Sequence, residues 1–225
     1  MHPIAHAASR PDHPAVIMTG SGAQMTYREM DEASNRFGHL LRARGMGPAK
    51  VGSYKGGDAF AVLLESRMEF YTLNWGSQRV GTMLVPVSTR LTGPEIAYIL
   101  KDSEAKLLVT STRFAEVTNV IRAECPDLEI LVMDSEGEDD FADELARYGD
   151  APVENQHVGQ VMLYSSGTTG RPKGVKPAAP EDTDPQAVVP LMGLATMGVG
   201  WPADGSMVYL SPAPLYHAAP LGWFS

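Results

Sequence analysis

Short apolar runs alternate with amphipathic stretches through the middle of this 225-residue chain, and this alternation restricts its fold more than any other feature. The apolar runs, each typical of a buried strand, lie at residues 59–66, 82–88, 106–111 and 128–134. The amphipathic stretches, whose apolar residues have helical spacing, lie at residues 67–80, 94–102 and 113–124. Strands and helices in this order predict an α/β fold with a mostly parallel sheet and flanking helices.

The first 45 residues predict a hairpin followed by one long helix. Residues 14–20 and 22–27 have the composition of two short strands on either side of a glycine-containing turn. Thr26, with Glu29 three positions later, has the pattern of a capping box, so we expect a helix to begin after Thr26. Gly45 is a natural end for that helix.

The composition is that of an ordinary globular protein, with 44% hydrophobic and 20% charged residues. A formal net charge of −9 would repel a polyanion, and the basic residues are scattered, so we expect no nucleic-acid partner. The N-terminus lacks the pattern of a secretory signal. Prolines and glycines interrupt the apolar region at 185–225, so we expect no transmembrane segment. The missing secretory signal and the single cysteine lead us to expect a cytoplasmic protein.

The sequence offers no convincing set of metal ligands. The histidines lack metal-site spacing, and in the acidic run at 134–144 the glycine is misplaced for a calcium loop. We interpret that run as a solvated loop that leads into a short helix. Cys125, the single cysteine, fits a reducing compartment, and we expect it to be a small buried hydrophobe rather than a nucleophile.

A glycine- and hydroxyl-rich segment follows a predicted strand at 160–165. It does not match the G-x-x-x-x-G-K-[ST] loop of common nucleotide-binding proteins, because Pro172 precedes Lys173 and Gly174 follows it. Its glycines nevertheless allow backbone N–H groups to approach a phosphate closely and donate hydrogen bonds to it. Hydroxyls add further donors, and a lysine adds positive charge. The alternative for such a composition is a flexible surface linker. The candidate phosphate-binding residues are Ser165, Ser166, Gly167, Thr168, Thr169, Gly170 and Lys173.

The full stretch YSSGTTGRPKGV at 164–175 resembles the phosphate-loop motif of the adenylate-forming superfamily, which includes acyl-CoA synthetases and peptide-synthetase adenylation domains. The segments at 26–45, 60–111 and 210–223 are also similar to the N-terminal region of that family, in the same order. Among its members, RLTGPEIAYIL and PLYHAAP look closest to fatty-acid CoA ligases.

The resemblance implies a two-step reaction with ATP, magnesium and coenzyme A. A carboxylate attacks the α-phosphate of ATP to give an acyl-adenylate and pyrophosphate, and the thiol of coenzyme A then displaces AMP. The loop that ends at Lys173 would hold the β- and γ-phosphates and stabilise the charge on the leaving pyrophosphate. His217, in PLYHAAP, would lie beside the acyl pocket near the reacting carboxylate; the alternative is a hydrogen-bonded packing residue.

The resemblance also implies that later parts of such an enzyme are missing from the 225 residues, among them the adenine and ribose contacts and the C-terminal lysine domain. We therefore expect residues 1–225 to be a truncated N-terminal portion of the AMP-binding domain, inactive alone and prone to self-association. Two alternatives remain open. One is a non-catalytic module that binds nucleotide or a partner, and the other is an adenylation domain of the peptide-synthetase type.

Overall fold

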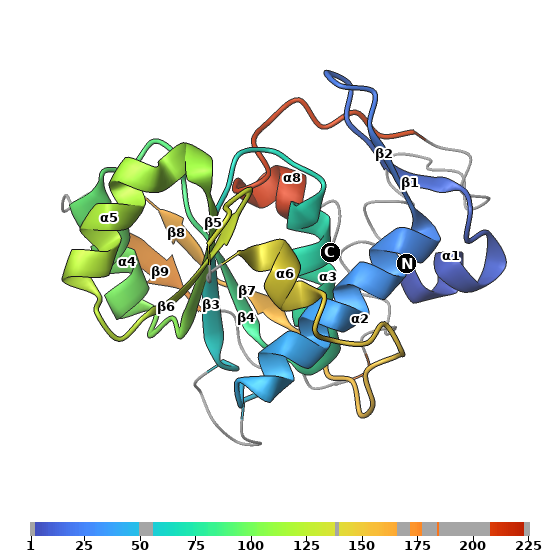
Figure 1. Cartoon of the computed structure of the whole chain (residues 1–225), viewed down its shortest axis with the longest axis horizontal. Helices are drawn as coiled ribbons and strands as arrows, with labels where there is room; N and C mark the ends of the chain where they lie inside the picture. Colours follow the sequence, from blue (N-terminus) through green and yellow to red (C-terminus); the bar gives the residue numbers. More distant parts are fainter. Residues whose placement is uncertain are drawn as a thin grey trace.

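The predicted parallel sheet forms the centre of the molecule (Figure 1). The computed structural model describes residues 3–49, 56–137, 140–165, 172–176, 184 and 208–222. Within these ranges the sheet has five parallel strands in the order β6-β5-β3-β4-β7. Their bounds are β3 Ala59–Leu63, β4 Met83–Pro86, β5 Leu107–Ser111, β6 Glu129–Met133 and β7 Gln160–Val161.

Helices cover both faces of this sheet (Figure 1). One face carries α2 (Tyr27–Ala43), α3 (Glu69–Val80) and α6 (Phe141–Leu145). The other carries α4 (Gly93–Asp102) and α5 (Ala115–Glu124), which follows a short 3₁₀ helix, η1 (Thr112–Phe114). The strand order explains this division, because the chain moves one way from β3 to β4 and returns past β3 to reach β5. Right-handed crossovers in opposite directions place their helices on opposite faces.

Alternation along β3 supplies side chains to both halves of the core. Phe60 and Val62 pack with residues of α2 and α3, whereas Ala61 and Leu63 pack with residues of α4 and α5. All of β3 is buried, as expected for the middle strand of a sheet covered on both faces.

The predicted helix starts are confirmed by their capping contacts. The Glu29 N–H donates to Thr26 Oγ1 at 3.2 Å, and the Thr26 N–H donates to Glu29 Oε2 at 2.7 Å. Thr92 and Glu95 form the same reciprocal pair at the start of α4. Hydrogen bonds from Thr26 lower the pKa of the exposed Glu29 carboxyl, which keeps it charged at the positive end of the helix dipole.

An N-terminal layer packs on the start of α2. It contains α1 (Pro3–Ser9) and the predicted hairpin, formed by the antiparallel strands β1 (Pro14–Ile17) and β2 (Gln24–Thr26). The guanidinium of Arg10 lies 5.3 Å from the centre of the Tyr27 ring, and the His6 ring lies 4.8 Å from the same ring. These contacts join α1 to α2.

The strand predicted at 160–165 is divided in two, which corrects the expectation of one continuous strand. Residues Gln160–Val161 form β7 beside β4, and Leu163–Ser165 form β8, which leaves the parallel sheet. The Met162 N–H still donates to the Leu84 carbonyl at 2.9 Å. In a parallel ladder the next bond would come from the N–H of Pro86, and proline has none. The ladder therefore ends there.

Candidate functional site

The two ends of the predicted phosphate loop lie next to each other. β8 (Leu163–Ser165) pairs antiparallel with β9 (Lys173–Val175), and Ser165 is the cross-strand partner of Lys173. Ser166, Gly167, Thr168, Thr169 and Gly170 lie outside the described residues. The sequence predicted no strand at 173–175. The hairpin brings together two of the predicted site residues, one hydroxyl and one ammonium.

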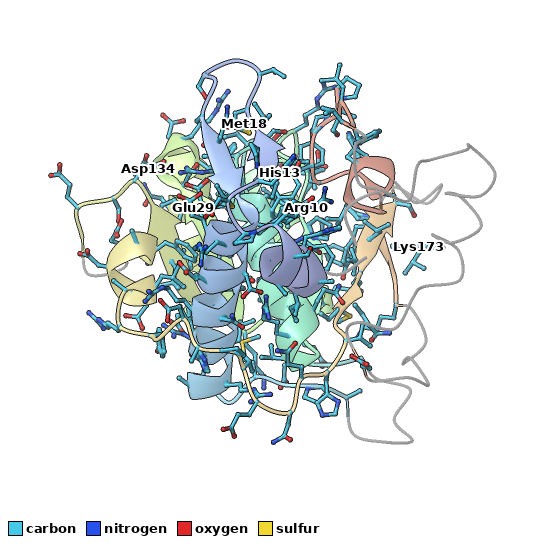
Figure 2. All side chains as sticks on the ribbon, turned by 90° about the vertical axis from the view of Figure 1, so that its right-hand side faces the viewer. Arg10, His13, Met18, Glu29, Asp134 and Lys173 are labelled. Atoms are coloured by element: carbon cyan, nitrogen blue, oxygen red, sulfur yellow. The ribbon has the colours of Figure 1, made fainter. Side chains whose placement is uncertain are left out.

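Lys173 is exposed, and Figure 2 shows its side chain directed away from the ribbon. Within the part of the chain that the structure describes, no carboxylate pairs with its ammonium group and no hydrogen bond is formed by it. The exposed side chain of Lys173 lies across the ladder from Ser165. Such a pair suits an anionic ligand.

The base of the hairpin is closely packed. A Cβ atom placed on Gly174 would lie 2.1 Å from Met162 Cε and 2.8 Å from Tyr164 Cζ, so the Tyr164 ring covers the glycine opposite it. The Tyr164 hydroxyl donates to Asp102 Oδ2 at 2.6 Å, across to the end of α4. Sequence reasoning missed this contact. The only local signal for it was the spacing of Met162 and Tyr164, which are two positions apart, as are residues on one face of a strand.

The segment with His217 docks at a different place. Leu215 and Tyr216 are buried, and the Leu215 N–H donates to Ser66 Oγ at 3.4 Å, just beyond the carboxyl end of β3. His217 itself is exposed, 4.6 Å from the Tyr216 ring between centroids, and it directly precedes α8 (Ala218–Gly222). Among the described residues, no hydrogen bond or ion pair joins His217 to Lys173.

The carboxyl ends of β3, β5 and β6 carry a network of charges around Arg67. Its guanidinium donates to Glu69 at 2.7 and 2.8 Å and to Asp134 at 2.6 and 3.2 Å. These hydrogen bonds and charges lower the pKa of the Asp134 carboxyl. The Ser111 hydroxyl donates to Glu65 at 2.8 Å. In α/β sheets, ligands bind at the edge where the strand order reverses. The Arg67 network lies at that point, between β3 and β5.

The described residues contain no cluster of three or more His, Cys, Asp or Glu side chains that could hold a metal ion. No helix in the same ranges is both long enough and apolar enough to cross a membrane. Cys125 is half-buried, and burial raises the pKa of its thiol, which disfavours the thiolate. The acidic run enters the short helix α6, with Asp140 as its N-cap, as the sequence predicted.

A profile of the AMP-binding enzyme family matches residues 4–225, which is almost the whole chain. The chain belongs to the AMP-binding enzyme family. The AMP-binding fold seen here, a parallel sheet with helices on both faces, is also that of solved relatives. The inhibitor-bound N-terminal domain of FACL13 from Mycobacterium tuberculosis is 25% identical, with a TM-score of 0.72 over 99% of this chain and 52% of that one. A long-chain-fatty-acid CoA ligase homologue from Rhodopseudomonas palustris, 22% identical with a TM-score of 0.77, shares the fold.

Curated AMP-binding relatives include two fatty-acid ligases. The fatty acid–[acyl-carrier-protein] ligase ScoC of Streptomyces coeruleorubidus is 35% identical over 76% of this chain. The long-chain-fatty-acid–CoA ligase FadD13 of Mycobacterium tuberculosis is 35% identical over 72% of it. The matched region covers 31% of the length of each of these two relatives. Tyrocidine synthase 2 of Brevibacillus parabrevis is 27% identical over 75% of this chain and 4% of its own length.

Proposed function

We propose that residues 1–225 are the N-terminal part of the AMP-binding domain of an ATP-dependent acyl-CoA ligase. In this proposal the enzyme activates a carboxylic acid, in particular a fatty acid, as an acyl-adenylate with release of pyrophosphate. The thiol of coenzyme A then displaces AMP to give the thioester. Family membership and the two 35% identical fatty-acid ligases support this function.

The observation that carries the proposal is the hairpin of β8 and β9, which pairs Ser165 across the ladder with the exposed Lys173. ATP supplies the phosphoanhydride bond that is broken. Ser165 and Lys173 would hold its β- and γ-phosphates, so that positive charge and a hydroxyl donor already face the oxygens on which charge develops. The loop residues Ser166 to Gly170 would add further donors.

His217 has a separate role in this proposal. It lies on the segment that docks beside Ser66 rather than on the hairpin, so we assign it to the carboxylic acid instead of the nucleotide. Its exposure leaves the imidazole accessible to a substrate. The ring contact with Tyr216 would restrict its orientation.

Replacement of Lys173 by Ala tests the assignment of the hairpin. In the natural polypeptide that contains this chain, we expect the exchange of labelled pyrophosphate into ATP, driven by a fatty acid, to fall by about 10²- to 10³-fold. The reason is the loss of one preorganised charge at a developing anion. His217→Ala is the matched comparison, and it should alter the Michaelis constant of the acid more than that of ATP. An unchanged exchange rate in the Lys173 variant would remove the hairpin from the reaction.

The same assay separates the fatty-acid ligase from its nearest alternative. Peptide-synthetase relatives such as tyrocidine synthase 2 leave an amino acid as a candidate substrate. A panel of fatty acids and amino acids, each with magnesium and ATP, should give exchange with fatty acids. Addition of coenzyme A should then yield AMP and thioester. Exchange driven by amino acids alone would replace the proposed function by adenylation of the peptide-synthetase type.

A further inference from the structure

The hydroxyl group of Tyr164 ties the base of the β8–β9 hairpin to the end of α4. It donates to Asp102 Oδ2 at 2.6 Å, and Asp102 is the last residue of α4. The two residues are separated by 62 positions in the sequence. In Figure 1 the hairpin lies beside α4, on the face of the sheet that α4 and α5 cover.

The hydrogen bond of Tyr164 can restrain the candidate site because the site residues form the next cross-strand pair of the hairpin. Tyr164 lies opposite Gly174, and the adjacent pair along the same ladder is Ser165 with Lys173. The ring also rests on Gly174, since a Cβ atom there would come within 2.8 Å of Tyr164 Cζ and 3.0 Å of its hydroxyl oxygen. A shift of the ring would therefore move the strand that carries Lys173.

Each partner of the ring is itself held in place. Met162, which contacts the same side of Gly174, is only 2% exposed and belongs to the core between the sheet and α4. Ile99 and Leu100, in the last turns of α4, are buried in that core. The capping box of Thr92 and Glu95 secures the other end of α4. Asp102 is therefore a rigid anchor although its side chain is exposed.

The charge of Asp102 is unfavourable for its own helix. A carboxylate at the C-terminus of a helix faces the negative end of the helix dipole, where cations are preferred. The hydrogen bond from Tyr164 gives that carboxylate a partner from another element. Burial and the bond to Asp102 raise the pKa of the Tyr164 phenol, so the hydroxyl keeps the proton that it donates.

We propose that Tyr164 is a positioning residue of the ligase, which acts through Asp102 and Gly174 to hold Ser165 and Lys173 in register for the nucleotide phosphates. The proposal rests on the function proposed above. It assigns Tyr164 no contact with the substrate. Its effect on the reaction is indirect, through the position of the hairpin.

The first test measures the anchor without any activity. Tyr164→Phe keeps the ring on Gly174 and removes only the hydroxyl. In the 225-residue chain, deuterium exchange of the amides in 163–165 and 173–175 should become about tenfold faster, the effect of losing one hydrogen bond to a charged group. Tyr148→Phe is the control, because its hydroxyl also donates to a carboxylate, that of Glu144 at 3.3 Å, away from the hairpin. Unchanged exchange in the hairpin would overturn the proposal.

The second test measures the consequence for the reaction in the natural polypeptide. Tyr164→Phe and Asp102→Ala should each raise the Michaelis constant for ATP about fivefold to tenfold and leave that for the acid unchanged. The double variant should be no worse than either single variant, because both remove the same bond. Asp102→Asn keeps an acceptor oxygen and should restore most of the ATP affinity. Asp127→Asn, which removes an exposed carboxylate elsewhere, should have no effect.

The outcomes separate the two proposals. Suppose that the unsubstituted enzyme catalyses pyrophosphate exchange, and that Tyr164→Phe speeds deuterium exchange in the hairpin but leaves the Michaelis constant for ATP unchanged. The positioning role is then wrong and the ligase assignment stands. If the unsubstituted enzyme exchanges no pyrophosphate with any acid, the ligase assignment fails, and the catalytic part of this proposal fails with it. The positioning role is supported if Tyr164→Phe speeds deuterium exchange in the hairpin and also raises the Michaelis constant for ATP, and if Asp102→Asn keeps most of the ATP affinity that Asp102→Ala loses.

Discussion

Arg79 is fully buried at the interface of α2 and α3. Its Nε donates to Ser34 Oγ at 3.0 Å, and its Nη2 donates to Asp31 Oδ1 at 2.5 Å. The two helices approach closely here, since a Cβ atom on Gly76 would lie 2.6 Å from Phe37 Cδ1. A buried cation in such an interface is stable only while its partners remain.

Arg79→Ala should lower the free energy of unfolding by about 3–5 kcal/mol, because Asp31 loses its cationic partner and the buried Ser34 hydroxyl loses its donor. Arg28→Ala is the matched control. Its pair with Asp12 at 3.2 Å is largely exposed, so its loss should cost at most about 1 kcal/mol. Urea unfolding followed by circular dichroism would measure both values. Equal losses in the two variants would contradict a structural role for the buried pair.

At the scale of elements, α1 is joined to α2 by a small aromatic and basic cluster. The Arg10 side chain lies 3.0 Å from His6 Nδ1 and also contacts the Tyr27 ring. Figure 2 shows Arg10 and His13 on this N-terminal layer. Burial lowers the pKa of His6, and the positive charges of Arg10, the N-terminus and His13 lower it further. The lowered pKa favours the neutral imidazole in the folded chain, whose Nδ1 can accept a hydrogen bond.

The packing of α1 should weaken as the pH falls below 6.5, the ordinary pKa of a histidine. Below that value the unfolded segment takes up a proton that the folded segment resists, so stability is complete above pH 6.5 and decreases toward the lowered pKa. An NMR titration should give His6 a pKa below 6.5, and Arg10→Gln should move it upward. A His6 that titrates at or above the ordinary value would show that α1 does not pack as described.

At the scale of the whole molecule, the sheet is the common support of both candidate segments. The β8–β9 hairpin packs on the side of α4, whereas the segment before His217 joins the core on the side of α2 and α3. Phosphate and acyl functions are thus assigned to elements on opposite faces of one parallel sheet. Their relative position depends on the rigidity of that sheet.

Deuterium exchange of the whole chain should rank its elements by this architecture. Amides of β3 and β5 should exchange most slowly, because both strands are buried and have paired neighbours on each side. Amides of α1 and of the β1–β2 hairpin should exchange orders of magnitude faster, since opening them leaves the central sheet intact. Similar rates in the two regions would indicate that the N-terminal layer and the sheet unfold together.

Much of the fold was predictable from local patterns. The strand at 59–63 and the helix that begins after Thr26 follow from apolar periodicity and from the capping pair of Thr26 and Glu29. Gly81 ends α3 with a φ of 73°, a conformation that glycine adopts without strain. Phosphate binding stays a prediction: it rests on the motif at 164–175, since the composition alone would also fit a surface linker.

The sequence by itself determined most of the strands and helices of the central sheet, because these depend on neighbours within a few positions. It also led to the prediction of a phosphate-binding segment. Only the tertiary structure decided the end of β7 opposite Pro86, the pairing of Ser165 with Lys173, and the bond from Tyr164 to Asp102. These contacts depend on strand order and on how the chain crosses the sheet. They join residues far apart in the sequence, and the local spacing of apolar residues does not specify which distant residue each one contacts.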